Sequence, residues 1–312
     1  MQLPGSSILV TGATGFTGSF VTARLLEAGA RVRALVRRDV DVPGATTVPG
    51  DLLEPDGLTA AVEGVDAVVH CAIAYHLPYD EARRLTVEGT RALAESARAA
   101  GCERFVHIST ISVYDVRHVD VVDEATPLYH PDEGEEGPYS VSKAEAERAL
   151  AAVAAKGLPT VMLRPPAILG PHPRCGWTLD LARRVAQGKV SYAGDDREKL
   201  PYVFVENLAD AVTLALESDA AAGGRYNVID GHERWQDYLE RLAAVSGRRL
   251  HPDPDQALEE DSLRLYDGSL IRQRLGYEPR VGFEEGMAAI VAFLESQDLT
   301  ARHRSGRSTV RR

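Results

Sequence analysis

The sequence contains only three cysteines, Cys71, Cys102 and Cys175, and they lie far apart in the chain. No pair has the spacing of a metal site, and an odd count does not fit a disulfide framework. We therefore expect reduced thiols, no bound metal and a cytoplasmic location. The sequence also lacks an apolar run long enough to cross a bilayer and a basic-then-apolar leader, so we expect no membrane segment.

Lysine is scarce as well. The only lysines are Lys143, Lys156, Lys189 and Lys199, and the formal net charge is -11. An excess of acidic side chains repels a phosphate backbone, which argues against a nucleic-acid partner. The basic segment 301–312 is the exception; it lacks apolar periodicity and is predicted to be a disordered tail.

The first half of the chain alternates short apolar segments with longer helical ones. Strands are predicted at 8–10, 30–37, 46–52, 66–72, 104–110 and 158–164, and helices after residue 18 and at 81–100 and 138–156. This alternation is typical of an α/β fold with a doubly wound parallel sheet of the Rossmann type. A chain of 312 residues can hold this sheet and a second lobe.

Beyond residue 166 the pattern weakens, with helices predicted at 176–188, 207–217, 234–246 and 284–296 and strands at 202–205 and 226–229. We predict a dinucleotide-binding Rossmann domain made of residues 1–166 with 201–230. A smaller, mixed α/β substrate-binding lobe would consist of residues 167–200 with 231–300. The polar, acidic segment 115–137 is predicted to be a surface loop.

A glycine-rich turn follows the first predicted strand and opens the first predicted helix. Glycine lets the backbone turn sharply and approach a phosphate without a Cβ in the way. The free N–H groups and the positive end of the helix dipole then attract a pyrophosphate. The turn therefore predicts a dinucleotide site at Gly12, Thr14, Gly15, Phe16, Thr17 and Gly18.

The end of the second predicted strand indicates which dinucleotide is bound. An acidic residue there would bind the ribose 2′-OH of NAD, whereas an arginine accepts the 2′-phosphate of NADP. The strand ends in Val36, Arg37 and Arg38, with no carboxylate before Asp39. We expect NADP bound through Arg37, with NAD as the alternative cofactor; the other interpretation is a solvated, basic strand end.

Tyr139 and Lys143 are four residues apart in a predicted helix, so their side chains project from the same face. A free phenol has a pKa of about 10 and is a poor base at neutral pH. A lysine ammonium beside it favours the phenolate and makes the pair a proton-transfer device. The spacing alone also fits an exposed tyrosine beside a solvated lysine.

Hydroxyl groups end the predicted strand 104–110, at Ser109 and Thr110. Ligands of a doubly wound sheet bind at the carboxyl ends of its strands. A hydroxyl there either binds a substrate oxygen or caps a turn. The glycine turn, Asp51 and the segment 70–72 end strands in the same way, so we expect them to meet at one edge.

Taken together, these motifs resemble the extended short-chain dehydrogenase/reductases of the NAD-dependent epimerase/dehydratase family. The resemblance runs from about Ile8 to Ser296 and includes the stretches 109–114, 163–171, 204–211 and 226–228. It implies that Tyr139 is the general acid/base, that Lys143 binds the nicotinamide ribose and lowers the pKa of the phenol, and that Thr110 orients the reacting oxygen. It adds cofactor contacts from Asp51, Leu52, Cys71, Ala72, Ser109, Tyr139, Lys143 and Pro166.

Substrate contacts are predicted near the mouth of this site, although packing explains each residue equally simply. They are Tyr75, His76, Ile111, Ala167, Trp177 and Tyr192. The resemblance also implies a homodimer that pairs helices 81–100 and 138–155 of two copies.

Departures from the family pattern narrow the function. Family dehydratases carry a carboxylate where this chain has Thr110 and Ile111, which argues against dehydration. Enzymes acting on nucleotide sugars commonly have an arginine where this chain has Leu200, next to Lys199. We expect an oxidoreductase interconverting a secondary alcohol and a ketone on a small, non-nucleotide substrate. The alternatives are a nucleotide-sugar epimerase and a cofactor-sensing regulator without catalysis.

Overall fold

The computed structural model describes residues 1–73, 78–130, 137–253, 255–258 and 263–299. Its centre is a seven-stranded sheet in which every neighbouring pair is parallel. The strands lie in the order β10 (Arg225–Asn227), β7 (Thr160–Arg164), β5 (Arg104–Ile108), β4 (Ala67–His70), β1 (Ser7–Thr11), β2 (Arg31–Val36) and β3 (Thr46–Pro49). The order reverses between β1 and β4, where doubly wound sheets bind their ligands. The predicted fold class is confirmed.

Helices cover both faces of this sheet. The apolar sides of α1 (Phe16–Glu27), α7 (Val205–Glu217) and α9 (Ser269–Leu275) pack into one core with β1 and β2. The opposite core contains side chains of α2 (Pro55–Val62), α4 (Gly89–Ala99) and α5 (Pro138–Ala154). Strands β1, β4, β5 and β7 are buried along their whole length, as a sheet covered on both faces requires.

The predicted helix 81–100 is divided in the structure. It begins as α3 (Tyr79–Arg83), passes through a π-helical turn, η1 (Arg84–Glu88), and continues as α4. The predicted strand 46–52 is shorter than expected, because β3 ends at Pro49 and Asp51 lies in the following turn. Within the predicted loop 115–137, the structure adds a two-residue strand, β6 (Val121–Val122), paired with β12 (Leu265–Tyr266).

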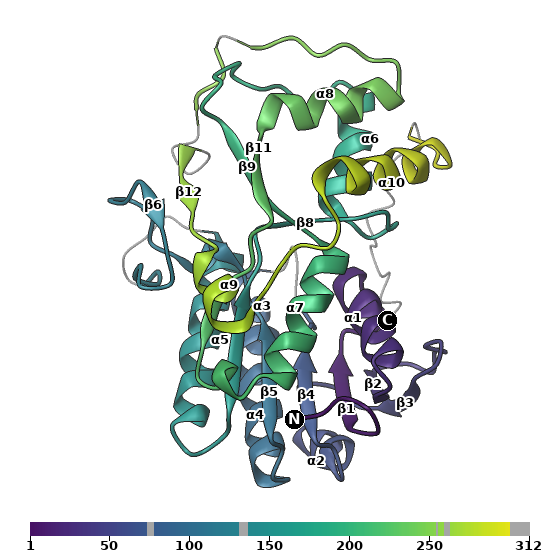
Figure 1. Ribbon diagram of the computed structural model, residues 1–312, viewed down its shortest axis with the longest axis vertical. Helices are drawn as coiled ribbons and strands as arrows, with labels where there is room; N and C mark the ends of the chain where they lie inside the picture. Colours follow the sequence, from purple (N-terminus) through teal and green to yellow (C-terminus); the bar gives the residue numbers. More distant parts are fainter. Residues whose placement is uncertain (74–77, 131–136, 254, 259–262, 300–312) are drawn as a thin grey trace, which may run out of the picture.

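A second, smaller layer lies beyond the carboxyl ends of the large sheet (Figure 1). Strand β9 (Lys199–Phe204) pairs parallel with β8 (Ala167–Leu169) and antiparallel with β11 (Gly231–Arg234). Strands β8 and β9 share a core with η3 (Gly176–Asp180), α6 (Leu181–Ala186), α8 (Trp235–Val245) and α10 (Phe283–Glu295). The short turns η2 (Ile111–Val113) and η4 (Asp219–Ala221) complete the elements. The division into two lobes stays a proposal, with β10 in the large sheet and β9 in the small one.

Candidate functional site

The glycine turn leaves no room for side chains at two of its positions. Gly12 has a φ of +71°, and a Cβ on it would lie 2.8 Å from the backbone nitrogen of Ala72. A Cβ on Gly18 would lie 2.1 Å from the carbonyl oxygen of Gly12. The turn is therefore pressed against the end of β4, and only glycine fits at both positions.

The N-terminus of α1 is open to an anion. The helix begins at Phe16, and Gly15 before it offers no side-chain cap. The first N–H groups of a helix have no partner within the helix, and the dipole adds a partial positive charge. Uncapped donors beside this glycine-rich turn fit the pyrophosphate of a dinucleotide.

The expected adenosine side of the site is formed by the ends of β2 and β3. Arg37 follows β2 directly and is exposed, so its guanidinium is accessible to an anion. Asp51 is half-buried, and its carboxylate accepts a hydrogen bond of 3.0 Å from the backbone nitrogen of Leu53. Leu52 is also half-buried, so both predicted adenine contacts keep accessible surface.

The end of β4 is held by a buried histidine. His70 Nδ1 lies 2.6 Å from the hydroxyl of Thr11, and its Nε2 lies 3.0 Å from the hydroxyl of Thr90. Burial lowers the pKa of His70 to about 3, and the charge of Lys143 acts in the same direction. A neutral His70 thus fixes the segment that leads to the predicted cofactor contacts Cys71 and Ala72, both half-buried.

Tyr139 and Lys143 occupy the first two turns of α5, with very different exposure. Tyr139 is half-buried, whereas Lys143 is only 1% exposed. The Lys143 ammonium donates to the carbonyl of Ile108 at 2.7 Å, at the end of β5. Burial lowers the pKa of Lys143 to about 8, although the nearby carboxylate of Glu147 opposes this shift. The helix therefore brings a cation to the carboxyl edge of the sheet.

The hydroxyls of Ser109 and Thr110 have different partners. Ser109 donates to the carboxylate of Glu147 at 2.5 Å, so its hydroxyl joins β5 to α5. The oxygen of Thr110 accepts from the backbone nitrogen of Ser112 at 3.2 Å, which caps η2. Its proton has only a long contact of 3.3 Å to the Ser112 hydroxyl. The cap fixes the Thr110 oxygen and leaves its proton available to a ligand.

A buried network, which the sequence reasoning missed, supports these hydroxyls from behind. Arg164 and Glu147 are each 1% exposed and form a two-pronged ion pair with N–O distances of 2.9 and 2.5 Å. Arg164 also donates to the hydroxyl of Tyr114 at 2.7 Å, and Tyr114 donates to Asn227 at 2.6 Å. Glu147 follows Lys143 by four residues on the same helix face, a spacing that the sequence already contained.

The predicted substrate contacts fall into different environments. Ile111, Ala167 and Tyr192 are buried, and Tyr192 belongs to the core of the small lobe. Trp177 is 44% exposed on η3, with its ring edge-on to Trp235. Tyr75 and His76 lie outside the described residues, and Pro166 is buried between β7 and β8. Trp177 is thus the described candidate that offers the most surface to a substrate.

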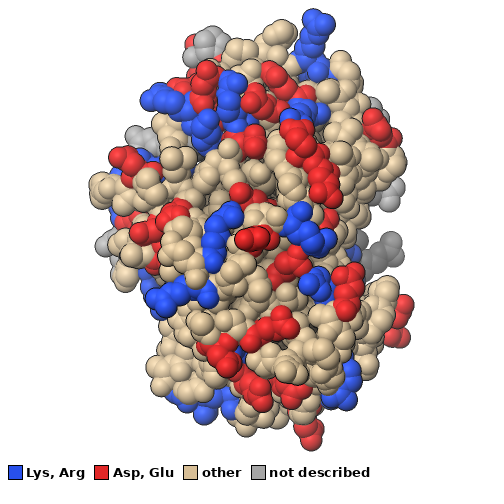
Figure 2. Space-filling view, viewed as in Figure 1, with Lys and Arg blue, Asp and Glu red and all other residues tan. Residues whose placement is uncertain are grey.

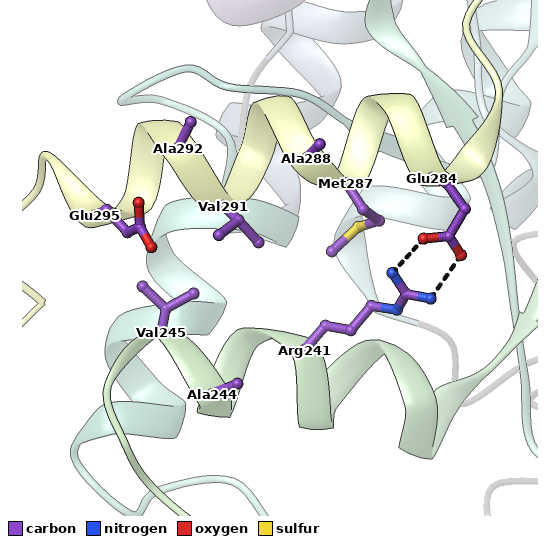
Figure 3. A pocket seen from close by; sticks show the side chains of 9 residues that line it. All are labelled: Arg241, Ala244, Val245, Glu284, Met287, Ala288, Val291, Ala292 and Glu295. Carbon is purple, nitrogen blue, oxygen red and sulfur yellow. Dashed lines mark hydrogen bonds and ion pairs between the residues drawn. The ribbon is translucent and has the colours of Figure 1, made fainter.

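A groove lies between α8 and α10 in the small lobe (Figure 3). Its floor is apolar, with Val245, Met287 and Val291 among the lining residues. The ion pair between Arg241 and Glu284 crosses one end, with N–O distances of 2.6 and 2.8 Å. None of the predicted site residues lines this groove.

The charge distribution and the helices of the described residues bear on membrane and metal binding. On the face shown in Figure 2, acidic and basic side chains are interspersed without a field of one sign. Among the described residues, no helix is long and apolar enough to cross a membrane. Within the same part of the chain, no cluster of His, Cys, Asp and Glu could hold a metal ion.

Comparison with known proteins identifies a family model, related enzymes and solved structures that resemble this chain. Residues 8–228 match the family model described as the NAD dependent epimerase/dehydratase family. Over 333 residues the chain is 30% identical to a 2-alkyl-3-oxoalkanoate reductase from Stenotrophomonas maltophilia (strain K279a), covering 91% of this chain and 98% of the relative. It is 31% identical over 238 residues to a UDP-glucose 4-epimerase from Vibrio cholerae, covering 73% and 71%. The structure of a Thermus thermophilus UDP-glucose 4-epimerase in complex with NAD has a TM-score of 0.74 at 26% identity, covering 93% and 99%.

Proposed function

Because this chain belongs to the NAD dependent epimerase/dehydratase family, we propose that it interconverts a secondary alcohol and a ketone on a small, non-nucleotide substrate. It is an NAD(P)-dependent oxidoreductase of the extended short-chain dehydrogenase/reductase type. The similarity to a 2-alkyl-3-oxoalkanoate reductase over nearly its full length supports a 3-oxo acid or a related ketone as the substrate class.

The single observation that supports catalysis is the placement of Lys143. Its buried ammonium lies at the carboxyl edge of the sheet, one helical turn from Tyr139. Lowering a phenol pKa by about three units takes about 4 kcal/mol. One positive charge about 4 Å away, at an effective dielectric near 20, supplies roughly that amount. Lys143 thus suits Tyr139 to transfer a proton near neutral pH.

Each residue then has one task in reduction of the ketone. Tyr139 donates its proton to the carbonyl oxygen, and Lys143 stabilises the phenolate that remains. Thr110, held as the cap of η2, directs its proton to the same oxygen. The nicotinamide cofactor, when bound, supplies the hydride. In the oxidative direction Tyr139 accepts the proton from the alcohol.

We propose NADP as the preferred cofactor, with Arg37 as the ligand of the 2′-phosphate. Its support is the position of Arg37 directly after β2 and its exposure. The matching family is described as NAD dependent, and the similar Thermus thermophilus epimerase structure contains NAD. NAD is therefore the alternative cofactor against which the NADP proposal must be tested.

A cofactor-consumption assay separates this function from its main alternative. The purified protein is mixed with NADPH and a series of 2-alkyl-3-oxo acids, and in parallel with UDP-glucose. We expect NADPH to be oxidised in proportion to the ketone reduced. Interconversion of UDP-sugars without net oxidation, which the Vibrio cholerae relative makes a specific alternative, would replace the proposal with an epimerase.

A homodimer through helices 81–100 and 138–155 also stays a proposal. Charged pairs lie on and beside these helices: Arg91 with Glu95 on the first, and Lys156, just after the second, with Glu95. Such an interface would be polar and sensitive to salt. Sedimentation at low and high ionic strength tests it, and a single monomeric species under both conditions would contradict it.

A further inference from the structure

A segment from outside the large sheet lies on the glycine turn. This crossing segment, residues 170–175, connects β8 with η3. At its start the backbone of Gly170 approaches α1 so closely that a Cβ would lie 3.0 Å from the ring of Phe16. Phe16 is the first residue of α1, so the crossing segment contacts the structure that is expected to hold the pyrophosphate.

His172 fixes the path of the crossing segment over the turn. Its ring stacks on Phe16, with centroids 5.3 Å apart and an angle of 25° between the planes. Its Nδ1 accepts the backbone N–H of Arg174 at 3.0 Å. Burial, and then the charge of Arg174, lower the pKa of His172, which keeps the ring neutral and Nδ1 an acceptor. The stacked ring therefore sets where Arg174 leaves the backbone.

Arg174 reaches the tip of the turn. One of its terminal nitrogens donates to the carbonyl of Thr14, the residue before Gly15. Among the described residues no carboxylate pairs with Arg174, whereas Arg164 and Arg241 each have one. A guanidinium has five N–H donors, and the contact with Thr14 uses one direction only. An exposed cation without a described counter-ion thus lies beside the uncapped start of α1.

We propose that Arg174 binds the pyrophosphate of the dinucleotide. Its guanidinium adds a cation, from a segment outside the Rossmann sheet, to the N–H groups at the start of α1. A guanidinium fork matches two phosphate oxygens, and the α1 N–H groups bind the same anion from the other side. The inference rests on the proposed function, because it takes a dinucleotide as the ligand of the glycine turn.

The position of Arg174 favours the pyrophosphate over the 2′-phosphate. Arg174 contacts the turn that precedes α1, where pyrophosphates bind in such folds. Arg37 lies at the end of β2, where the 2′-phosphate is expected. Because NADH and NADPH share the pyrophosphate, loss of Arg174 should weaken both by the same factor.

Binding to the apoprotein tests this, without catalysis. Dissociation constants for NADPH and NADH are measured by protein fluorescence for the wild type, Arg174→Gln and Arg174→Ala. We expect both variants to bind both cofactors about ten- to a hundredfold more weakly, the range for a hydrogen bond to a charged group. Arg174→Gln keeps a neutral donor for the Thr14 carbonyl, so its loss of affinity reports the charge. Thermal unfolding confirms that the variants are folded.

Arg184→Ala is the matched control, since Arg184 is an exposed arginine of the same lobe on α6. It should leave both affinities unchanged. Wild-type affinity in Arg174→Gln would overturn the inference, and a loss confined to NADPH would reassign Arg174 to the 2′-phosphate. If the wild type binds neither cofactor, the proposed function itself fails, and the inference with it.

Discussion

The ammonium nitrogen of Lys143 lies 3.3 Å from Nε2 of His107, and both side chains are buried. Burial, and then the charge of Lys143, hold the pKa of His107 well below its usual range, so the ring is neutral and Nε2 accepts. The ring of His70 stacks on that of His107, with centroids 5.2 Å apart. The cation thus lies beside a neutral imidazole, on which a second one stacks, and its burial has a thermodynamic cost.

That cost predicts a pH-dependent stability. The pKa of Lys143 is about 8 in the folded protein, against an ordinary value of 10.5. Between these values the unfolded chain binds a proton that folded Lys143 has lost, so stability rises with pH. We expect the free energy of unfolding of the wild type, minus that of Lys143→Met, to increase by about 3 kcal/mol from about pH 7.5 to about pH 10.5.

Denaturant unfolding at several pH values measures this difference. Lys156→Met is the control, because Lys156 is exposed. Its difference from the wild type should stay flat over the same range. A flat difference for Lys143→Met as well would show that the buried ammonium is not destabilised.

Tyr139→Phe removes the hydroxyl proposed to transfer the proton. We expect kcat to fall by about 10²- to 10⁴-fold, the usual contribution of a general acid/base, while the dissociation constant of NADPH stays within about twofold. Tyr79→Phe is a matched control, since the Tyr79 hydroxyl donates to Glu145 on the outer side of α5. Unchanged turnover in Tyr139→Phe would refute the assignment.

Arg37→Ala tests the cofactor preference. The variant should bind NADPH about ten- to a hundredfold more weakly, because it loses a charged hydrogen bond to the 2′-phosphate, and should bind NADH as the wild type does. Arg33→Ala, which removes an arginine of the same strand that donates to the Glu63 carbonyl, should change neither affinity. Tighter binding of NADH than NADPH by the wild type would contradict the NADP assignment.

The pair of Glu147 and Arg164 is expected to be critical for stability. Glu147→Gln leaves the Arg164 charge buried without its carboxylate, which costs about 3–5 kcal/mol of unfolding free energy. The double variant Glu147→Gln, Arg164→Met removes the charge as well and should recover part of the loss. Urea unfolding measures the unfolding free energies of the single and the double variant, which are then compared. An equal or larger loss in the double variant would show that the arginine is not the source of the cost.

Glu147→Gln should also move the pH profile of the enzyme. The carboxylate raises the pKa of Lys143, so its removal lowers that pKa further. If the ammonium activates Tyr139, the alkaline limb of kcat/KM shifts to lower pH. Glu145→Gln, at a half-buried position of the same helix, serves as the control. A destabilised variant with an unshifted profile would restrict Glu147 to a structural role.

The sequence predicts the large sheet because strands buried on both faces are mostly apolar. The runs before Gly12 and before Ser109 need no tertiary information to be recognised. Strand β8 and strand β11 were missed, since three or four residues with partly exposed positions show no such signal. The small lobe is therefore the part for which periodicity is least informative.

The placement of Tyr139 and Lys143 on one helix was predictable, because it depends on spacing along a single element. Contacts between distant elements left no local signal. Arg174 lies 160 positions from Thr14 in the chain, and Arg164 on β7 forms an ion pair with Glu147 on α5. For Ser109 the resemblance implies a cofactor contact, and the structure adds that its hydroxyl donates to Glu147, a partner that no local pattern indicated.

One edge of the large sheet is formed by a strand, β10, that is synthesised late. Strand β10 pairs with β7, but strands β8 and β9 of the small sheet come between these two strands in the sequence. During synthesis β7 therefore emerges from the ribosome with an unpaired edge, which stays open until residues 225–227 follow. A nascent chain stopped in this interval would be prone to aggregate, and chaperones that bind exposed strands should associate with it at this stage.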